Sequence, residues 1–309
     1  MGVSWSDEVD EILSGDLAAG FAYLTPAKGV VIVPMAPLGL RDREAGTVTL
    51  TTSLGLWRKL DRVRRNPGVA VAYHAREHGF SDRPGFVLVQ GRASFSPTPD
   101  RAWLESITPD WNRFLVPRSS GGLGRVLDVY YWQRVAIDIQ VVRVVAYPDR
   151  AARQDPDVFG AERSPPPASQ EEPSGGTEPR VSVESVAAHA KRLPHTLLGW
   201  CGSDHLPDVV PVSAAHPAAD GLRLDVRSDS VPLGGRRAGL TSHEFWPRMV
   251  GQEQRIHTGW LSADDDGSVR YSPHSKSGYR LPRSKLLYNL GCASIARGMR
   301  GARRAELVR

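Results

Sequence analysis

The residues best suited to chemistry lie in one short segment, residues 51–67, with the sequence TTSLGLWRKLDRVRRNP. Three consecutive hydroxyl side chains end a strand-like run, and a helical stretch that carries Arg58, Lys59 and Arg62 follows. Hydroxyls, free backbone N–H groups at a helix start, and basic side chains are the donors that bind phosphate. Arg58 and Arg62 share a helix face because they lie four residues apart. The segment predicts a phosphate-binding corner, with a solvated basic helix face as the alternative.

Other catalytic and metal-binding patterns are absent from the sequence. His74 and His78 have the spacing of a metal-binding helix, but they follow a strand-like run and enter a loop rich in Gly, Asp and Pro. No Gly-x-Ser-x-Gly elbow, P-loop or dinucleotide glycine fingerprint occurs. Two cysteines, Cys201 and Cys292, are too few for a cysteine-based zinc site. We therefore predict no metal site and identify no catalytic side chain.

Length and composition are typical of a globular protein. The chain has 309 residues, of which 40% are hydrophobic and 24% charged, which favours two domains with buried cores. No apolar run of about 18 residues occurs, so we expect no membrane-spanning helix. The first residues, MGVSWSDEVDEIL, are acidic and lack the basic and apolar regions of a signal peptide. We expect a cytoplasmic protein.

The positive charge is concentrated at the end of the chain. The net charge is +5 and the isoelectric point is near 9.4, yet residues 283–309 alone hold seven Lys and Arg and one Glu. The rest of the chain is close to neutral, so we expect no nucleic-acid partner for its body. Residues 286–309 are predicted to form an amphipathic helix that packs on the body; contact with anionic lipid or nucleic acid is the alternative.

A segment rich in Pro and Gly, residues 151–180, divides the chain. It contains a triple proline, a glycine pair and few apolar residues, so it cannot bury enough surface to offset the entropy of ordering. We predict domains at residues 1–150 and 181–309, joined by this linker. In the first domain a Ser6-capped helix precedes a mostly antiparallel sheet. The predicted elements are strands Phe21–Leu24, Val30–Met35, Thr47–Thr52, Val69–Tyr73, Phe86–Phe95 and Val135–Tyr147, and a helix Leu56–Arg65 that ends at Asn66-Pro67.

The second domain repeats the order of the first. The runs Thr196–Trp200 and Asp208–Val212 match the first hairpin, Gly221–Val226 matches residues 46–51, and Arg255–Leu261 matches residues 88–93. The pattern predicts a mainly β chain made by internal duplication. Arg236 and Arg237 follow a serine and glycine run, as Arg58 does in the first copy. They are candidates for a second anion site or for the other wall of the first site, and a plain surface loop in a degenerate copy is the alternative.

The segment around Arg58 also resembles a known family. A strand ending in Thr-Ser, the pair Arg58-Lys59, then Val63, Asn66-Pro67 and a further strand are similar to the flavin-binding split β-barrel family of pyridoxamine 5′-phosphate oxidase-like proteins and their deazaflavin-dependent relatives. The run VLVQGRA resembles the glycine-centred strand of that family. The resemblance is clearest over residues 5–150 and weaker over 181–309. This chain departs from the pattern in the spacing between its serine and its basic pair, and Gly55 in that turn is more typical of the deazaflavin relatives.

The resemblance implies two tandem split β-barrels that form a pseudo-dimer within one chain, with the cofactor in a cleft between them. The implied cofactor is FMN or a deazaflavin (coenzyme F-420), with haem as a further alternative. The implied activity is hydride transfer between the cofactor and a small organic substrate, with reduced nicotinamide or reduced deazaflavin as donor. A non-catalytic flavin, deazaflavin or haem carrier on the same fold is the alternative. The candidate cofactor-binding residues are Thr52, Ser53, Gly55, Arg58, Lys59, Arg62 and, beside the ring, Gln90.

Overall fold

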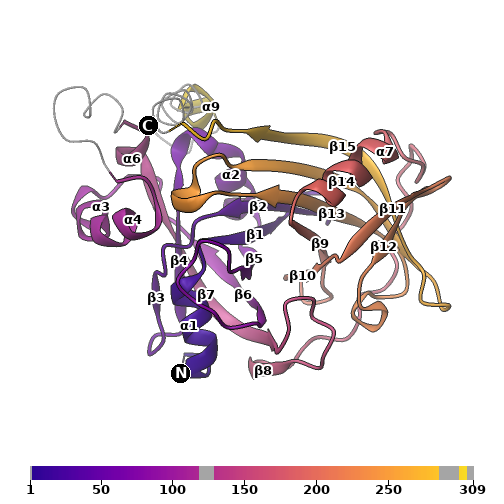
Figure 1. Ribbon diagram of the computed structural model, residues 1–309, viewed down its shortest axis with the longest axis horizontal. Coiled ribbons are helices and arrows are strands. Elements are labelled where there is room, and N and C mark those ends of the chain that lie inside the picture. Colours follow the sequence, from indigo (N-terminus) through magenta and orange to yellow (C-terminus); the bar gives the residue numbers. More distant parts are fainter. Residues whose placement is uncertain (1, 118–128, 285–298, 305–309) are drawn as a thin grey trace.

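The computed structural model describes residues 2–117, 129–284 and 299–304, and these are mainly β (Figure 1). Two sheets, one of eight strands and one of seven, contain all the strands of the described residues. The first copy of the fold has the elements α1 (Asp7–Gly15), β1 (Ala18–Leu24), β2 (Val30–Met35), β3 (Arg41–Asp42), β4 (Thr47–Ser53), η1 (Leu54–Leu56), α2 (Trp57–Arg65), β5 (Gly68–Ala75), β6 (Phe86–Ser94), α3 (Arg101–Ser106), α4 (Thr108–Phe114), α6 (Val129–Trp132), β7 (Arg134–Tyr147) and β8 (Asp157–Gly160).

The second copy follows with the elements α7 (Val183–Arg192), β9 (His195–Cys201), β10 (Pro207–Pro211), β11 (Ala214–Ala218), β12 (Gly221–Asp225), η2 (Ser228–Ser230), β13 (Gly234–Glu244), η3 (Pro247–Met249), β14 (Glu253–Ala263) and β15 (Val269–Arg280). A short helix, α9 (Met299–Arg304), follows. The predicted tail helix over 286–309 lies otherwise outside the described residues. Within the described ranges no helix is long and apolar enough to cross a membrane.

The two sheets have the same topology. The first runs β2-β1-β5-β6-β7-β4-β3, with β8 on the edge of β7, and the second runs β10-β9-β13-β14-β15-β12-β11. Each strand of the second sheet thus occupies the place of the strand eight numbers earlier. Neighbouring strands are antiparallel throughout. The predictions of a mainly β chain and of an internal duplication are confirmed.

Both copies begin with a helix that a serine caps. The Ser6 hydroxyl accepts a hydrogen bond from the Val9 N–H at 3.3 Å, and the Ser182 hydroxyl accepts one from the Ser185 N–H at 3.1 Å. Such caps satisfy amide groups that a helix start leaves free. Each helix then buries one apolar face against its own sheet: Val9, Ile12 and Leu13 in α1, and Val183, Val186 and Ala187 in α7.

The copies differ where the first carries extra helices. Helix α2 connects β4 to β5, whereas the corresponding connection in the second copy holds only η2. Helices α3, α4 and α6 lie between β6 and β7, whereas β14 and β15 are joined by residues 264–268 alone. The sequence analysis predicted α2 but none of the three inserted helices. These differences make the duplicated chain asymmetric.

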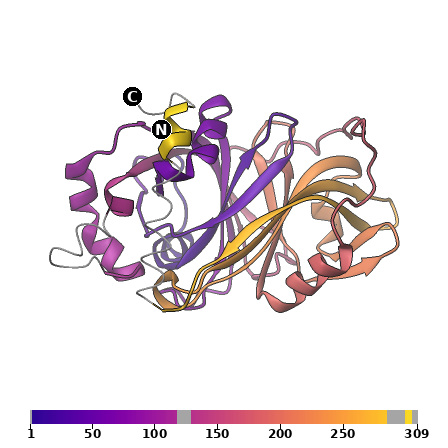
Figure 2. The ribbon, with the colours of Figure 1, turned by 90° about the horizontal axis from the view of Figure 1, so that it is seen from above.

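The copies pack closely along β2. Strands β13, β14 and β9 of the second copy contact β2, and the second sheet reaches over the first (Figures 1 and 2). Gly239 permits this approach, because a Cβ there would lie 2.3 Å from the carbonyl oxygen of Val30. The Thr241 hydroxyl donates a hydrogen bond to the Ile32 carbonyl at 2.9 Å. Residues from both copies share one buried apolar cluster, including Ile32, Leu197 and Val209.

The segment predicted as an unstructured linker makes specific contacts. Part of it, β8, pairs with β7, a strand that the sequence did not predict. Further on, the Arg236 guanidinium donates to the Pro167 carbonyl at 3.0 Å, and the Gln170 N–H donates to the Gly235 carbonyl at 2.8 Å. The linker backbone thus accepts hydrogen bonds from the second copy through a proline carbonyl and donates to it through an amide N–H. These bonds need partners far away in sequence, which local composition does not reveal.

Candidate functional site

A cleft of about 460 Å³ lies between the two copies. The first copy supplies β2, the end of β4, the start of α2, and α4; the second supplies η3, β14 and β15. The lining residues are Tyr23, Val33, Pro34, Met35, Ala36, Thr51, Thr52, Gly55, Leu56, Trp57, Arg58, Lys59, Trp111, Leu115, Arg134, Met249, Gln252, Gln254, Ile256, Ser277, Gly278 and Tyr279. The cleft therefore contains the predicted phosphate-binding corner.

The structure brings four of the seven candidate residues to this cleft. Thr52, Gly55, Arg58 and Lys59 line it. Ser53 is fully buried directly behind the wall, where its hydroxyl accepts a hydrogen bond from the Gly55 N–H at 3.1 Å. That bond caps η1 and fixes the turn that leads into α2. The strand, the capped turn and the helix follow one another in the order that the sequence predicts.

Two candidate residues lie elsewhere. Arg62 is one turn further along α2 than Arg58 and is not part of the cleft lining. Gln90 is fully buried between the copies, where its amide donates to the Pro207 carbonyl at 2.7 Å and to the Asp208 carboxylate at 3.0 Å. The Arg143 guanidinium donates to the amide oxygen of Gln90 at 2.5 Å. Gln90 thus serves the contact between the copies, away from the cleft.

Lys59 is a buried amine that has no carboxylate partner among the described residues. Its side chain is buried, and its Nζ lies 3.7 Å from the Met35 sulfur. Burial, and secondarily the charge of Arg134, lower the pKa of Lys59 to about 7. An ammonium group in such a place costs free energy until an anion joins it. The amine is therefore poised to gain both a proton and a partner when an anion binds.

Arg134 forms the opposite side of this basic region. Its guanidinium donates to the Thr51 hydroxyl and to the Thr51 carbonyl, both at 2.6 Å, and lies 4.9 Å from the centre of the Trp111 ring. Arg134 begins β7, which pairs with the end of β4. Sheet pairing therefore places a third cation beside Arg58 and Lys59, although it lies 75 residues after Lys59 in the chain.

No Asp or Glu belongs to the described lining of the cleft. Two further polar groups on its walls lack a hydrogen-bond partner among the described residues: the Thr52 hydroxyl and the side-chain amide oxygen of Gln254. Buried polar groups are seldom left unpaired in proteins. The three basic side chains and the Thr52 hydroxyl, with no carboxylate beside them, suit the binding of a phosphate group. The unpaired amide oxygen of Gln254 can accept a hydrogen bond from the polar edge of a ring.

The remaining walls suit a planar ring. Tyr23, Trp57, Trp111 and Tyr279 all line the cleft, together with the side chains of Met35 and Met249. Burial raises the pKa of the Tyr23 hydroxyl to about 12, so it stays protonated and can donate a hydrogen bond. Aromatic and thioether side chains make favourable contacts with flat ring systems. The basic corner and the aromatic walls lie in one cleft.

The corresponding corner of the second copy is filled by the chain itself. Arg227, at the end of β12, donates to the carboxylates of Asp155 and Asp229 at 2.6 Å and to the Gln154 carbonyl at 2.5 Å. The two arginines predicted to bind an anion there are also occupied by residues 167–171 and by the turn before β13. Groups from the linker and from the second domain itself thus occupy these arginines. Among the described residues, only the corner of the first copy opens into the cleft.

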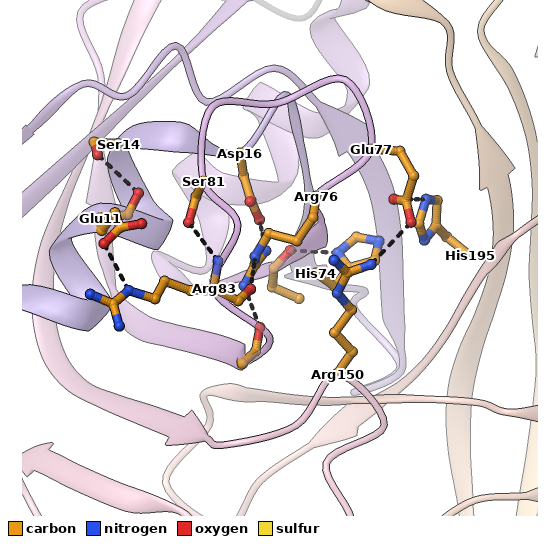
Figure 3. A network of polar contacts seen from close by, with 12 residues as sticks. Glu11, Ser14, Asp16, His74, Arg76, Glu77, Ser81, Arg83, Arg150 and His195 are labelled. Atoms are coloured by element: carbon orange, nitrogen blue, oxygen red, sulfur yellow. Dashed lines mark hydrogen bonds and ion pairs between the residues drawn. The ribbon is translucent and has the colours of Figure 1, made fainter.

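A second polar cluster lies where the copies meet near β5 and β13, and Figure 3 draws part of it. His74 donates through Nδ1 to the Ala72 carbonyl at 2.9 Å, and its Nε2 lies 2.9 Å from Nε2 of His243. Burial lowers the pKa of His74 to about 3 and holds that of His243 well below its usual value, so both rings are neutral. His195 also contacts both rings and pairs with the Glu77 carboxylate at 3.0 Å. Within the described ranges no group of three His, Cys, Asp or Glu could hold a metal ion.

Comparisons with known proteins give matches in solved structures only. No family model matches the sequence, and no curated protein matches it. The chain is similar to a Clostridium acetobutylicum protein of the pyridoxinephosphate oxidase family, with 13% identity over 50% of this chain and 92% of that chain (TM-score 0.35). It is similar to a pyridoxamine 5′-phosphate oxidase-related, FMN-binding protein from Nostoc punctiforme, with 7% identity over 63% and 86% (TM-score 0.31). A FAD-binding protein from Mesorhizobium loti matches with 16% identity over 52% and 97% (TM-score 0.29).

Several cleft residues were missed by sequence reasoning. Trp111 comes from an inserted helix, and Gln252, Gln254 and Tyr279 come from the second copy. Only Arg134 could have been found from a sequence pattern. It begins the strand with the clearest apolar alternation, and that strand pairs with the end of β4 that carries Thr52 and Ser53. No local pattern links the others to residues 51–67: Trp111 depends on how the inserted helix packs, and Gln252, Gln254 and Tyr279 depend on how the two copies pack.

Proposed function

We propose that the chain binds a flavin or deazaflavin by its phosphate in this cleft and transfers hydride between the bound cofactor and a small organic substrate. The observation that carries the proposal is the convergence of Arg58, Lys59 and Arg134 on a cleft whose described lining contains no carboxylate. Guanidinium and ammonium groups bind phosphate strongly when they are partly shielded from water. Aromatic walls beside them suit the ring system of such a cofactor.

The chain's own residues would have distinct tasks. Arg58, Lys59 and the Thr52 hydroxyl would hold the phosphate, and Arg134 would add positive charge to the same region. Gln254 and the protonated Tyr23 would bond to polar ring atoms, and Trp57 and Trp111 would exclude water. A bound flavin or deazaflavin supplies the hydride chemistry. None of the lining residues is Asp, Glu or His, so binding and orientation are the roles these side chains support.

A non-catalytic carrier is the second candidate. The same lining favours it, because the cleft holds phosphate donors and apolar walls but no carboxylate or imidazole to move a substrate proton. Flavin and deazaflavin fit the lining better than haem, since they carry a phosphate that the basic corner suits and haem carries none. Turnover with reduced nicotinamide or reduced deazaflavin distinguishes the enzyme from the carrier.

The test is a titration of the purified chain with FMN and with a deazaflavin, followed by fluorescence. We expect one bound equivalent per chain, because the second corner is occupied by Asp155 and Asp229. Arg58→Ala combined with Lys59→Ala should weaken binding about 100-fold or more, since bonds between charged groups contribute about 1.5–3 kcal/mol each. Arg223→Ala with Lys191→Ala is the matched control, because both side chains are exposed on the second copy. Equal affinity in the two double variants would refute the assignment.

A further inference from the structure

The amine of Lys59 has the surroundings of a nucleophile. Its side chain lines the cleft but is only 8% exposed. Its one polar contact with a described residue is the Met35 sulfur at 3.7 Å, and a thioether sulfur is a weak acceptor. A lysine amine becomes nucleophilic when it is withdrawn from water or lies beside another cation. Both conditions apply to Lys59, because burial and the charge of Arg134 lower its pKa to about 7.

The cleft around this amine favours a product that carries negative charge. The charge of Arg134 is close enough to act on Lys59, so the two side chains repel each other whenever both are cations. The Thr52 hydroxyl lines the same cleft, is 1% exposed and has no described hydrogen-bond partner. Neither Asp nor Glu occurs among the titratable side chains of the described lining, which are Tyr23, Arg58, Lys59, Arg134 and Tyr279. An anion formed on Lys59 would therefore meet guanidinium and hydroxyl donors and no competing carboxylate.

The charge of the product distinguishes between two small electrophiles that react with lysine amines. An aldehyde forms an imine with loss of water, and the protonated imine is again a cation beside Arg134. Carbon dioxide forms a carbamate: Nζ bonds to the carbon atom, one N–H proton passes to the solvent, and the amine becomes –NH–COO⁻. This step needs no oxidant, reductant or leaving group. It replaces repulsion from Arg134 by attraction, and the three added atoms are few for a cleft of about 460 Å³.

We propose that Lys59 binds carbon dioxide as a carbamate in the ligand-free protein, and that the carbamate prevents a phosphate group from binding in the cleft. The carbamate removes the ammonium group that would contact the phosphate and adds negative charge to a lining that otherwise has no carboxylate. Formation of the carbamate does not require the proposed function. Only its competition with a phosphate-bearing ligand rests on that function.

The other lysines of the described chain lack these surroundings. Lys28, Lys191 and Lys276 are exposed. A lysine in water has a pKa near 10.4, so at pH 7.5 almost all of it is ammonium, which has no electron pair to offer to carbon dioxide. The α-amino group of a chain, with a usual pKa near 8, is the one other amine that reacts at this pH. The expected carbamate is therefore confined to two places that peptide mapping separates.

The test is trapping of the carbamate on the full, ligand-free chain. The chain is equilibrated at pH 7.5 with carbon dioxide and bicarbonate labelled with carbon-13, and the carbamate is detected by carbon-13 NMR. Triethyloxonium then converts it to a stable ethyl carbamate, which peptide mass mapping locates. Lys59→Arg keeps a positive charge but has no amine, and the exposed Lys191→Arg is the matched control. Thermal unfolding checks that both variants stay folded.

We expect the trapped label at Lys59 in the unaltered chain and in Lys191→Arg, and at the α-amino group alone in Lys59→Arg. Peptides that contain the exposed lysines should carry less than about a tenth of the Lys59 label, because so little of each is neutral at pH 7.5. Absence of label at Lys59, or equal label on all lysine peptides, would overturn the inference. Both results are read from the unaltered chain and do not depend on how well a variant folds.

The second measurement is the affinity for FMN with and without carbon dioxide. When half of the unaltered chains carry the carbamate, the apparent Kd should rise about twofold, because only the other half can bind. Lys59→Arg should show no such rise. An equal rise in Lys59→Arg would identify bicarbonate as an ordinary competing anion and overturn the blocking role. If the unaltered chain binds neither FMN nor a deazaflavin, the proposed function fails, and the trapped label still decides whether Lys59 forms a carbamate.

Discussion

Replacing the buried amine of Lys59 should make the ligand-free protein more stable. Burial and Arg134 lower the pKa of Lys59 from 10.5 to about 7, whereas the unfolded chain keeps the usual value. The unfolded state therefore binds more protons between these two values, and stability falls as the pH falls through this window. At 1.36 kcal/mol per pKa unit the full penalty is about 5 kcal/mol, reached near pH 7. Lys59→Met removes it.

The assay is urea unfolding at pH 7 and pH 9.5. Relative to the unaltered chain, Lys59→Met should gain about 3 kcal/mol more at pH 7 than at pH 9.5, because the penalty grows by about 1.36 kcal/mol per pH unit across that interval. The exposed Lys191→Met is the control and should show no such difference. A Lys59→Met effect that is the same at both pH values would refute the reasoning, because the amine would then be charged in the folded protein.

Three further outcomes follow from particular contacts. Thr52→Val should raise the free energy of unfolding of the ligand-free protein by about 1 kcal/mol, because it removes a buried hydroxyl that has no described partner. It should also raise the Kd for FMN about fivefold, because the ligand loses that hydroxyl; urea unfolding and isothermal titration measure the two effects, and an unchanged Kd would contradict the assignment. Gly239→Ala should cost about 2 kcal/mol or more in urea unfolding, since its Cβ would press on the Val30 carbonyl oxygen, and an unchanged midpoint would contradict the described contact between the copies. His74→Phe should reduce by about 3 kcal/mol the loss of unfolding free energy between pH 6.5 and pH 4. The pKa of His74 is about 3 in the folded protein and 6.5 in the unfolded chain, so protonation favours unfolding as the pH falls. An equally steep fall in unfolding free energy with pH in the variant would contradict this.

The elements that local patterns determine were predictable from the sequence. Alternating apolar residues predicted both hairpins and the long strand after Arg134, and a polar cap predicted the first helix. The stop at Asn66-Pro67 predicted the end of α2, where the structure has Arg65 as its last residue. Each of these signals acts within a few residues. They sufficed to reveal the repeat, because the same signals recur in the same order.

The parts that depend on packing between distant segments were not predictable. The resemblance of the Gly-centred strand to the family placed Gln90 beside a cofactor ring. In the structure the register of β6 shifts between Gln90 and Gly91, and the Gln90 amide bonds to Pro207 and Asp208 on β10 of the second copy. The walls from Trp111 and Gln254 depend on an inserted helix and on the second sheet. Half of the cleft therefore belongs to segments that no local pattern connects to Arg58.

The most direct test of the central claim is isothermal titration of the full chain with a flavin or a deazaflavin, which gives the stoichiometry and the affinity of binding. The titration is repeated at pH 6 and pH 8 in two buffers of different ionisation enthalpy, so that proton uptake is measured as well. The account predicts one equivalent per chain, with uptake of close to one proton at pH 8 and little at pH 6, because Lys59 with a pKa of about 7 gains its proton when the phosphate binds. Lys59→Met should abolish the uptake. Absence of binding, two equivalents per chain, or the same proton uptake in the Lys59→Met variant would contradict it.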